Sequence, residues 1–130
     1  MKFRLAIFAA LAGIVIPAMP ALAHHSFAAE YDSNKPVEIK GTVTKVDWTN
    51  PHARFYVDVK GKDGKVVNWN FELASPNVLI RNGWSRKSLK EGDEVTVSGS
   101  QAKDGANLAN ARSIVLSDGR KVFAGQVDTN

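Results

Sequence analysis

The feature that most constrains the fold is a set of short segments in which apolar and polar residues alternate. Val37, Ile39 and Val43 alternate with polar or charged residues, and the same period of two recurs in residues 55–59 and 67–73. This period places successive side chains on opposite faces of an extended chain, as in a half-buried β-strand. The chain is therefore predicted to be all-β apart from one short helix.

Interruptions of the pattern predict how these strands bend and connect. Gly41 lies inside the first strand, and the apolar phase then shifts to even positions at Val46, which indicates a β-bulge or strong coiling. Asp63-Gly64 separates the next two strands and is typical of a tight hairpin turn.

The helix is predicted directly after the third strand. Ser75 is suited to the N-cap and Pro76 to the first turn, and Asn82-Gly83 is suited to the end of a helix over residues 77–81. Further strands are expected over residues 95–99 and 108–116, with a short segment at 122–123. Three strands, a helix and two or more strands is the order of a five-stranded, oligonucleotide/oligosaccharide-binding (OB)-like barrel, with a small β-sandwich as the alternative.

The N-terminus has the pattern of a secretory signal peptide. Lys2 and Arg4 precede an apolar run over residues 5–16, and Ala21-Leu22-Ala23 offers small residues at the −3 and −1 positions. We predict cleavage after Ala23 and a periplasmic protein. The apolar run, which Pro17 and Pro20 end, is too short for a stable membrane span, and we expect no such span after the signal is cleaved.

The predicted organisation is a signal peptide (1–23), an extended N-terminal arm (24–36), the OB-like domain (37–125) and a loose tail (126–130). Phe27 and Tyr31 are expected to pack the arm against the domain. Without Lys2 and Arg4, the mature chain has 15 basic and 13 acidic residues, so its net charge is +2 and it has no basic footprint for nucleic acid. The absence of cysteine excludes disulfides and thiolate ligands.

The three histidines of the chain suggest a metal site. Cleavage after Ala23 makes His24 the first residue, so it offers both an amine and an imidazole, with His25 next to it and His52 in the predicted Asn-Pro-His turn. Nitrogen ligands of this kind suit Cu(II). Two nearby carboxylates, Asp47 and Glu30, are candidates for a further ligand. The simpler alternative is that His24 and His25 are a polar flank of the signal and His52 caps a turn.

The aromatic residues suggest a second kind of site. Trp48 and Trp84 lie at the ends of predicted elements and are candidates for an exposed binding platform, together with Asn50. Phe55 and Phe71, like Trp69, share the phase of aliphatic neighbours and are assigned to the core. The alternative to copper binding is therefore an interaction module that recognises a partner protein or a glycan of the cell envelope. A third alternative is a role in envelope stability without a small ligand.

Catalysis finds no support in the sequence. No serine has a Gly-x-Ser-x-Gly setting, and Ser26 next to His25 is adjacency in sequence rather than a triad. We therefore predict a binding protein that is not an enzyme and has no catalytic residues.

Several motifs together resemble one family. The chain is similar to a family of small exported bacterial proteins, carried as a domain of unknown function, that begin with His-His-Ser-Phe after the signal. The resemblance implies a periplasmic OB-like domain without assigned binding residues, and it links the His-His start with the Asn-Pro-His turn as hallmarks. The motifs are His24-His25-Ser26-Phe27, Tyr31-Asp32, Gly41-Thr42-Val43, Trp48-Thr49-Asn50-Pro51-His52, Trp69-x-Phe71-Glu72, Asn82-Gly83-Trp84 and Leu89-Lys90-x-Gly92-Asp93.

Overall fold

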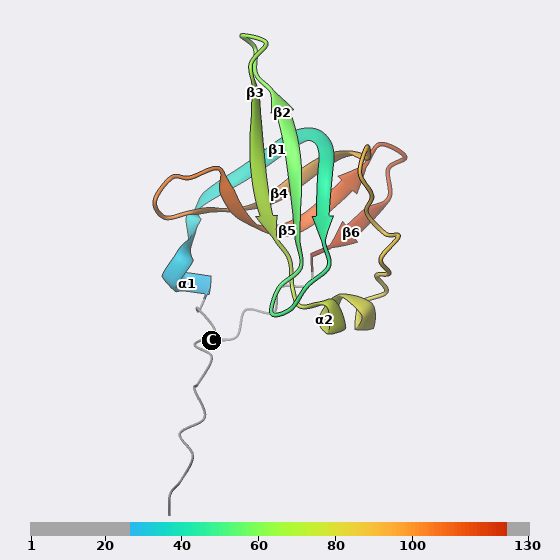
Figure 1. Ribbon diagram of the computed structural model, residues 1–130. Helices are drawn as coiled ribbons and strands as arrows, with labels where there is room; N and C mark the ends of the chain where they lie inside the picture. Colours follow the sequence, from blue (N-terminus) through green and yellow to red (C-terminus); the bar gives the residue numbers. More distant parts are fainter. Residues whose placement is uncertain (1–26, 125–130) are drawn as a thin grey trace, which may run out of the picture.

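A computed structural model describes residues 27–124, which contain six strands and two short helices (Figure 1). The signal peptide, His24, His25 and the tail from 126 lie outside the described residues. The predicted strand-rich architecture is confirmed, with a sixth strand and a second helix that were not predicted. The elements are α1 (Phe27–Glu30), β1 (Tyr31–Asp47), β2 (Arg54–Lys60), β3 (Val66–Glu72), α2 (Pro76–Arg81), β4 (Glu94–Ala102), β5 (Leu108–Leu116) and β6 (Lys121–Phe123).

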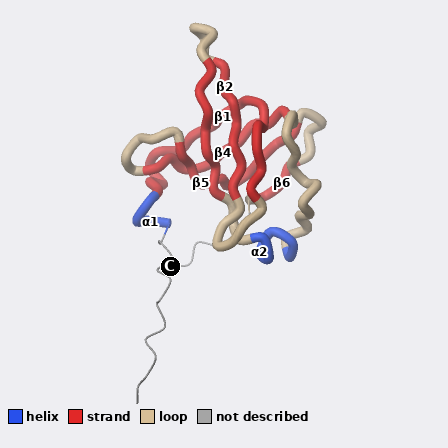
Figure 2. The backbone as a smooth tube through the Cα atoms, in the orientation of Figure 1, coloured by secondary structure: helices blue, strands red, loops and turns tan. Residues whose placement is uncertain are grey.

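The strands form one sheet in the order β3-β2-β1-β4-β5-β6, with antiparallel neighbours throughout (Figure 2). A further, parallel pairing joins residues 70–72 of β3 to residues 108–110 of β5. Strands β1 to β5 thereby complete a ring of hydrogen bonds, and β6 pairs with a later part of β5. The ring leaves few unpaired backbone groups at the sheet edges.

The long strand β1 makes this ring possible because it serves two neighbours. Its first part pairs with β4 and its last part with β2, and Thr42 is aligned with residues of both strands. At Gly41 the backbone of β2 approaches so closely that a Cβ atom would collide with the carbonyl oxygen of Asp58. The pairing register with β2 then shifts between Val43 and Lys45, which confirms the predicted bulge.

Strand β1 also begins earlier than the predicted start at Val37. Tyr31 and Pro36 already align with Ala102 and Ser100 of β4, and the backbone N–H of Lys103 donates to the carbonyl oxygen of Glu30 at 2.9 Å. Residues 31–36 are mostly polar and show no alternation, so the sequence pattern did not reveal them as a strand. Backbone pairing with β4 holds them in place instead.

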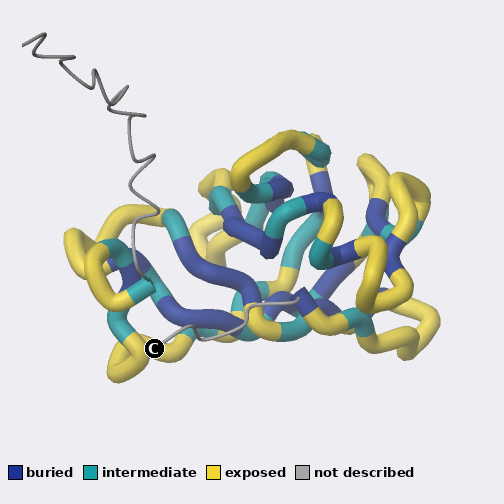
Figure 3. The backbone as a smooth tube through the Cα atoms, turned by 90° about the horizontal axis from the view of Figure 1, so that it is seen from below, coloured by how far each residue is buried: buried dark blue, intermediate teal, exposed yellow. Residues whose placement is uncertain are grey.

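The core lies inside the ring, and burial is concentrated along the strands while the connecting loops are exposed (Figure 3). The rings of Phe55 and Phe71 stack with centroids 5.1 Å apart, and both side chains are fully buried. Trp69 is partly buried against this core, with its ring 6.0 Å from that of Phe71. Phe55 and Phe71 are therefore core residues, as their phase predicted, whereas Trp69 packs against the core and remains partly accessible.

Helix α2 follows the prediction closely. Ser75 is its N-cap, since the backbone N–H of Val78 donates to the Ser75 side chain, and Pro76 opens the first turn. Gly83, with φ of +91°, supplies the left-handed residue after the helix, whereas Asn82 does not adopt that conformation. Leu79 is fully buried and anchors the helix to the core. No helix among residues 27–124 is long and apolar enough to cross a membrane.

Candidate functional site

The β1–β2 loop and α2 lie near one end of the sheet (Figure 1). A surface cleft is formed there by residues of this loop, of α2 and of the loop that follows α2. Its volume is about 520 Å³, which is in the range of small-molecule sites. We call it the tryptophan cleft, and it is lined by Trp48, Asn50, Pro76, Asn77, Ile80, Trp84, Ser85 and Arg86.

Two indole rings form the aromatic part of the cleft. The centroids of Trp48 and Trp84 are 6.4 Å apart and the rings are inclined by 30°. The Nε1–H of Trp84 donates to the carbonyl oxygen of Phe123 at 2.8 Å, so this indole is fixed against β6. Among the described residues the Trp48 indole has no hydrogen-bond partner, and its ring is only partly buried. Trp84 is therefore the rigid wall of the cleft, and Trp48 is the ring with an unused donor.

The polar part of the cleft consists of groups that the rest of the described chain leaves unbonded. The side chains of Asn50 and Asn77 make no hydrogen bond within residues 27–124, and both are exposed. The guanidinium of Arg86 likewise has no ion pair or hydrogen bond there. Amide groups supply both donors and acceptors, and arginine supplies donors only. The cleft thus combines an aromatic wall with unpaired hydrogen-bonding groups and one cation.

The structure brings together the three residues that the sequence analysis named as candidate ligand-binding residues, Trp48, Asn50 and Trp84. The expected exposure of Trp84 is wrong, since only 6% of this residue is accessible. Its indole packs on Trp48 and donates a hydrogen bond to the backbone of Phe123, the last residue of β6. This contact joins residues 39 positions apart, and no local pattern shows it. The sequence analysis also missed Asn77 and Arg86, although the basic run after α2 was a visible signal.

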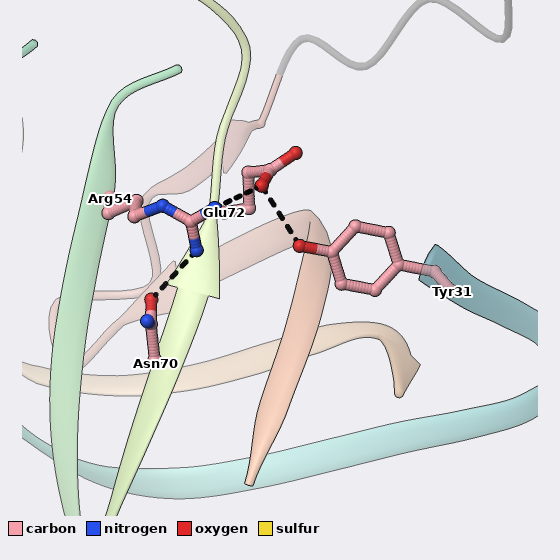
Figure 4. A network of polar contacts seen from close by, with 4 residues as sticks. All are labelled: Tyr31, Arg54, Asn70 and Glu72. Carbon is pink, nitrogen blue, oxygen red and sulfur yellow. Dashed lines mark hydrogen bonds and ion pairs between the residues drawn. The ribbon is translucent and has the colours of Figure 1, made fainter. Parts of the chain in front are cut away.

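A second group of polar residues is bonded to itself instead of being left open. The Tyr31 hydroxyl donates to Oε2 of Glu72 at 3.0 Å, and the same oxygen accepts from Nη2 of Arg54 at 2.5 Å (Figure 4). Nη1 of Arg54 also donates to Oδ1 of Asn70 at 3.4 Å. We call these four residues the Glu72 network. It fastens the first residue of β1 to the ends of β2 and β3.

Burial explains the electrostatics of the Glu72 network. Glu72 is 6% accessible and Tyr31 is 2% accessible. Loss of hydration, followed by the nearby Glu72 carboxylate, raises the pKa of the Tyr31 phenol well above its usual value. The phenol therefore remains a donor to the carboxylate over the whole physiological pH range. The buried charge of Glu72 is compensated by Arg54 and by this neutral donor.

Of the candidate metal ligands, the structure describes His52, Asp47 and Glu30. No group of three or more histidine or carboxylate side chains that would hold a metal ion occurs among residues 27–124. His52 is partly buried in the β1–β2 loop, directly after the cis Asn50–Pro51 bond. Asp47 forms an ion pair with Lys45 at 3.0 Å. A site of the predicted composition therefore depends on His24 and His25, which precede the described residues.

Together, the fold and the tryptophan cleft define a small, mostly antiparallel β-sheet protein with an aromatic surface cleft. The chain belongs to the family of unknown function DUF6152, whose family model matches residues 11–111. That range includes all the residues that line the cleft and all three histidines. A search of curated proteins found no match.

Proposed function

We propose that this protein is an exported binding module of the cell envelope, whose ligand occupies the tryptophan cleft. Cleavage after Ala23 would release it into the periplasm as an OB-like barrel that binds and does not catalyse. We also propose that the His-His-Ser-Phe start and the Asn-Pro-His turn are hallmarks of its family. The ligand belongs to one of the two classes named from the sequence, a glycan or a partner protein.

The observation that carries this proposal is the meeting of Trp48, Asn50 and Trp84 in one cleft. These residues come from two segments more than 30 positions apart. The Asn50 amide is exposed, and the Trp48 indole packs against the core but remains partly accessible. Aromatic walls with a few oriented polar groups are characteristic of ligand sites. The hydrogen-bonding groups of Trp48, Asn50 and Asn77 are available to a ligand because the described chain does not use them.

The indole N–H groups offer a test with an internal control, because the chain has three tryptophans. In nuclear magnetic resonance spectra of the ¹⁵N-labelled, processed protein, the Trp48 and Trp84 indole signals should shift when the ligand binds. The Trp69 signal should stay in place, since that ring packs on Phe71 away from the cleft. Soluble glycan fragments and a protein fraction from the envelope would be added separately. The proposal is wrong if neither moves the Trp48 signal.

A second candidate function is copper binding by the His24 amine and the imidazoles of His24, His25 and His52. The specific observation in its favour is the Glu72 network. His52 lies two residues before Arg54, and Arg54 binds the carboxylate that also holds Tyr31. His24 lies three positions before Phe27, the first residue of α1, and three extended residues span up to about 10 Å. The network thus fastens the start of β1, and with it the end of α1, to Arg54, two residues after His52. This supports the proposal that His24 reaches His52.

Spin resonance of the processed protein titrated with Cu(II) tests this second function. His52→Ala and a variant with one glycine inserted before His24 should each weaken binding at least tenfold, because each removes part of the nitrogen ligand set. Glu91→Gln, at an exposed carboxylate outside the predicted ligand set, is the control and should leave the affinity unchanged. Unchanged affinity in both histidine-site variants would contradict the copper proposal and leave the cleft proposal intact.

A further inference from the structure

The cleft also indicates the chemical class of its ligand. We infer that the tryptophan cleft binds an acidic saccharide, with Arg86 binding the sugar carboxylate and Trp48 stacking on a sugar ring. This inference rests on the proposed binding function and names the ligand of that same site. It follows from the distribution of charge around the cleft, from the unpaired state of Arg86, and from the kind of surface that surrounds Arg86.

Of the two segments that form the cleft, one carries only positive charges and the other carries no Lys, Arg, Asp or Glu. Residues 48–53 contain no acidic or basic side chain apart from His52, and residues 73–90 contain four basic residues and no acidic one. The whole chain has 17 basic and 13 acidic residues, so this one-sided stretch is not a reflection of overall composition. The basic residues are Arg81, Arg86, Lys87 and Lys90. A local field of one sign favours a ligand of the opposite sign.

Most of the acidic side chains that flank these segments are bonded within the fold, and Glu91, which follows Lys90, is exposed and does not line the cleft. Asp47, just before Trp48, is paired with Lys45 at 3.0 Å. Asp93 accepts a hydrogen bond from the backbone N–H of Lys90 at 2.8 Å, and Asp118 is bonded to Arg120. Among the described residues Arg86 is therefore an arginine that lines the cleft without a carboxylate partner. A planar guanidinium binds a carboxylate through two parallel hydrogen bonds, which makes Arg86 a specific receptor for that group.

The rest of the cleft favours a sugar as the carrier of the carboxylate. The apolar face of a pyranose ring packs on an indole, and the hydroxyl groups need both donors and acceptors nearby. Trp48 offers the ring, and the amides of Asn50 and Asn77 offer the donors and acceptors. A cleft of about 520 Å³ accommodates one or two sugar rings, whereas a nucleic acid needs a basic groove along several nucleotides.

The experiment compares two probes that differ only in charge. The processed protein is titrated with a trisaccharide of galacturonic acid and with the neutral trisaccharide of galactose, by calorimetry and by the indole resonance signals. The acidic probe should bind at least tenfold more tightly and shift the Trp48 signal. Its affinity should fall when salt is raised from 20 to 500 mM, because Arg86 is exposed and salt screens such charges.

Variants at Arg86 test whether this residue causes the preference for the acidic trisaccharide. Arg86→Gln should lower the affinity for the acidic probe about tenfold without altering that for the neutral probe, and Arg86→Lys should retain part of it. Lys62→Gln, in the exposed β2–β3 turn, removes the same charge at a distance and should change neither affinity.

Each other result has a definite meaning. Equal binding of the two probes, or an unchanged preference in Arg86→Gln, overturns the inference while the proposed binding function stands. Tighter binding of a thymidine oligonucleotide than of the acidic sugar overturns it in favour of nucleic acid. If neither sugar binds, the inference is wrong, and the proposed function then depends on the response of Trp48 to the envelope fractions.

Discussion

The tryptophan cleft and the Glu72 network are built from similar side chains and differ in whether those side chains are satisfied. Each contains an aromatic ring with a polar group, an arginine and an asparagine amide. In the network, the Tyr31 hydroxyl and the Arg54 guanidinium both bind Glu72. In the cleft, the Trp48 indole N–H has no hydrogen-bond partner and the Arg86 guanidinium has no ion pair or hydrogen bond within residues 27–124.

This difference shows what each region contributes. Burying a charge without a partner costs several kcal/mol, so a carboxylate at 6% accessibility must be bonded within the fold. The network therefore stabilises the protein by joining β1 to β2 and β3. Exposed groups in the cleft carry no such cost and are available to a ligand. Changes in the network should then lower stability, and changes in the open part of the cleft should lower binding.

The largest effect is expected from Glu72→Ala. It leaves the half-buried Arg54 guanidinium and the buried Tyr31 hydroxyl without their acceptor, which should lower the free energy of unfolding by about 3 kcal/mol. Urea unfolding followed by circular dichroism measures this. Asp58→Ala is the matched control on the neighbouring part of the hairpin, since Asp58 accepts only an exposed hydrogen bond from Asn68. Equal losses in the two variants would contradict a special role for the network.

Trp84→Phe should have the next largest effect, because Trp84 is a residue of the cleft that is buried and hydrogen-bonded like the residues of the network. It lines the cleft, yet it is buried and its Nε1–H holds the carbonyl oxygen of Phe123 at the end of β6. The loss of this hydrogen bond and of part of the ring should lower stability by about 1–2 kcal/mol. Trp69→Phe is the control, since the described residues give its indole no hydrogen bond. Similar losses at both positions would mean that the bond to Phe123 contributes nothing.

Tyr31→Phe should lower stability by about 1 kcal/mol at neutral pH, through the lost hydrogen bond to Glu72. Its pH dependence is more informative. Because burial raises the phenol pKa in the folded protein, the folded state holds the proton more tightly than the unfolded chain, whose tyrosines titrate near pH 10. This contribution is complete below pH 10 and is lost as the pH rises above it.

The wild type should therefore lose up to about 1.4 kcal/mol per pH unit above pH 10 through Tyr31 alone, and Tyr31→Phe should lack this slope. Unfolding by urea at several values between pH 8 and pH 11 measures the difference between the two proteins. Tyr56→Phe, at the other tyrosine of the chain, should keep the wild-type slope. If the two substitutions act alike, the pKa of Tyr31 is not raised by the fold.

Much of the fold was predictable because its signals are local. Alternation marked β2 and β3, the phase shift after Gly41 marked the bulge, and Ser75-Pro76 marked the start of α2. The first six residues of β1 escaped prediction because backbone pairing with β4 decides their structure, and their side chains carry no pattern. The parallel contact of β3 with β5, which completes the ring, joins residues 38 positions apart and has no sequence signal of its own.

The candidate site was predictable in part for the same reason. Trp48, Asn50 and Trp84 were predicted as candidate ligand-binding residues because they lie at or near the ends of predicted elements. Their meeting in one cleft required the ring to bring the β1–β2 loop against α2. Glu72 and Tyr31 were not predicted as partners, because an outward position in a strand is expected to be solvated. In the structure Glu72 is aligned with Asn110 across the pairing of β3 with β5, and Asn110 is aligned with Ser100 across the pairing of β4 with β5. All three residues are buried, so polar residues here are part of the interior.

The smallest expected effect on stability is also the sharpest test of the comparison. Arg86→Gln should leave the free energy of unfolding within about 0.5 kcal/mol of wild type, because the side chain is exposed and has no partner in the described chain. Thermal and urea unfolding check this, with Arg54→Gln as the matched change in the network, expected to cost about 2 kcal/mol. A guanidinium that the fold does not use remains available to the carboxylate of a ligand. If Arg86→Gln destabilises the fold as much as Arg54→Gln, then Arg86 is a structural residue, and the contrast between an open cleft and a closed network does not hold.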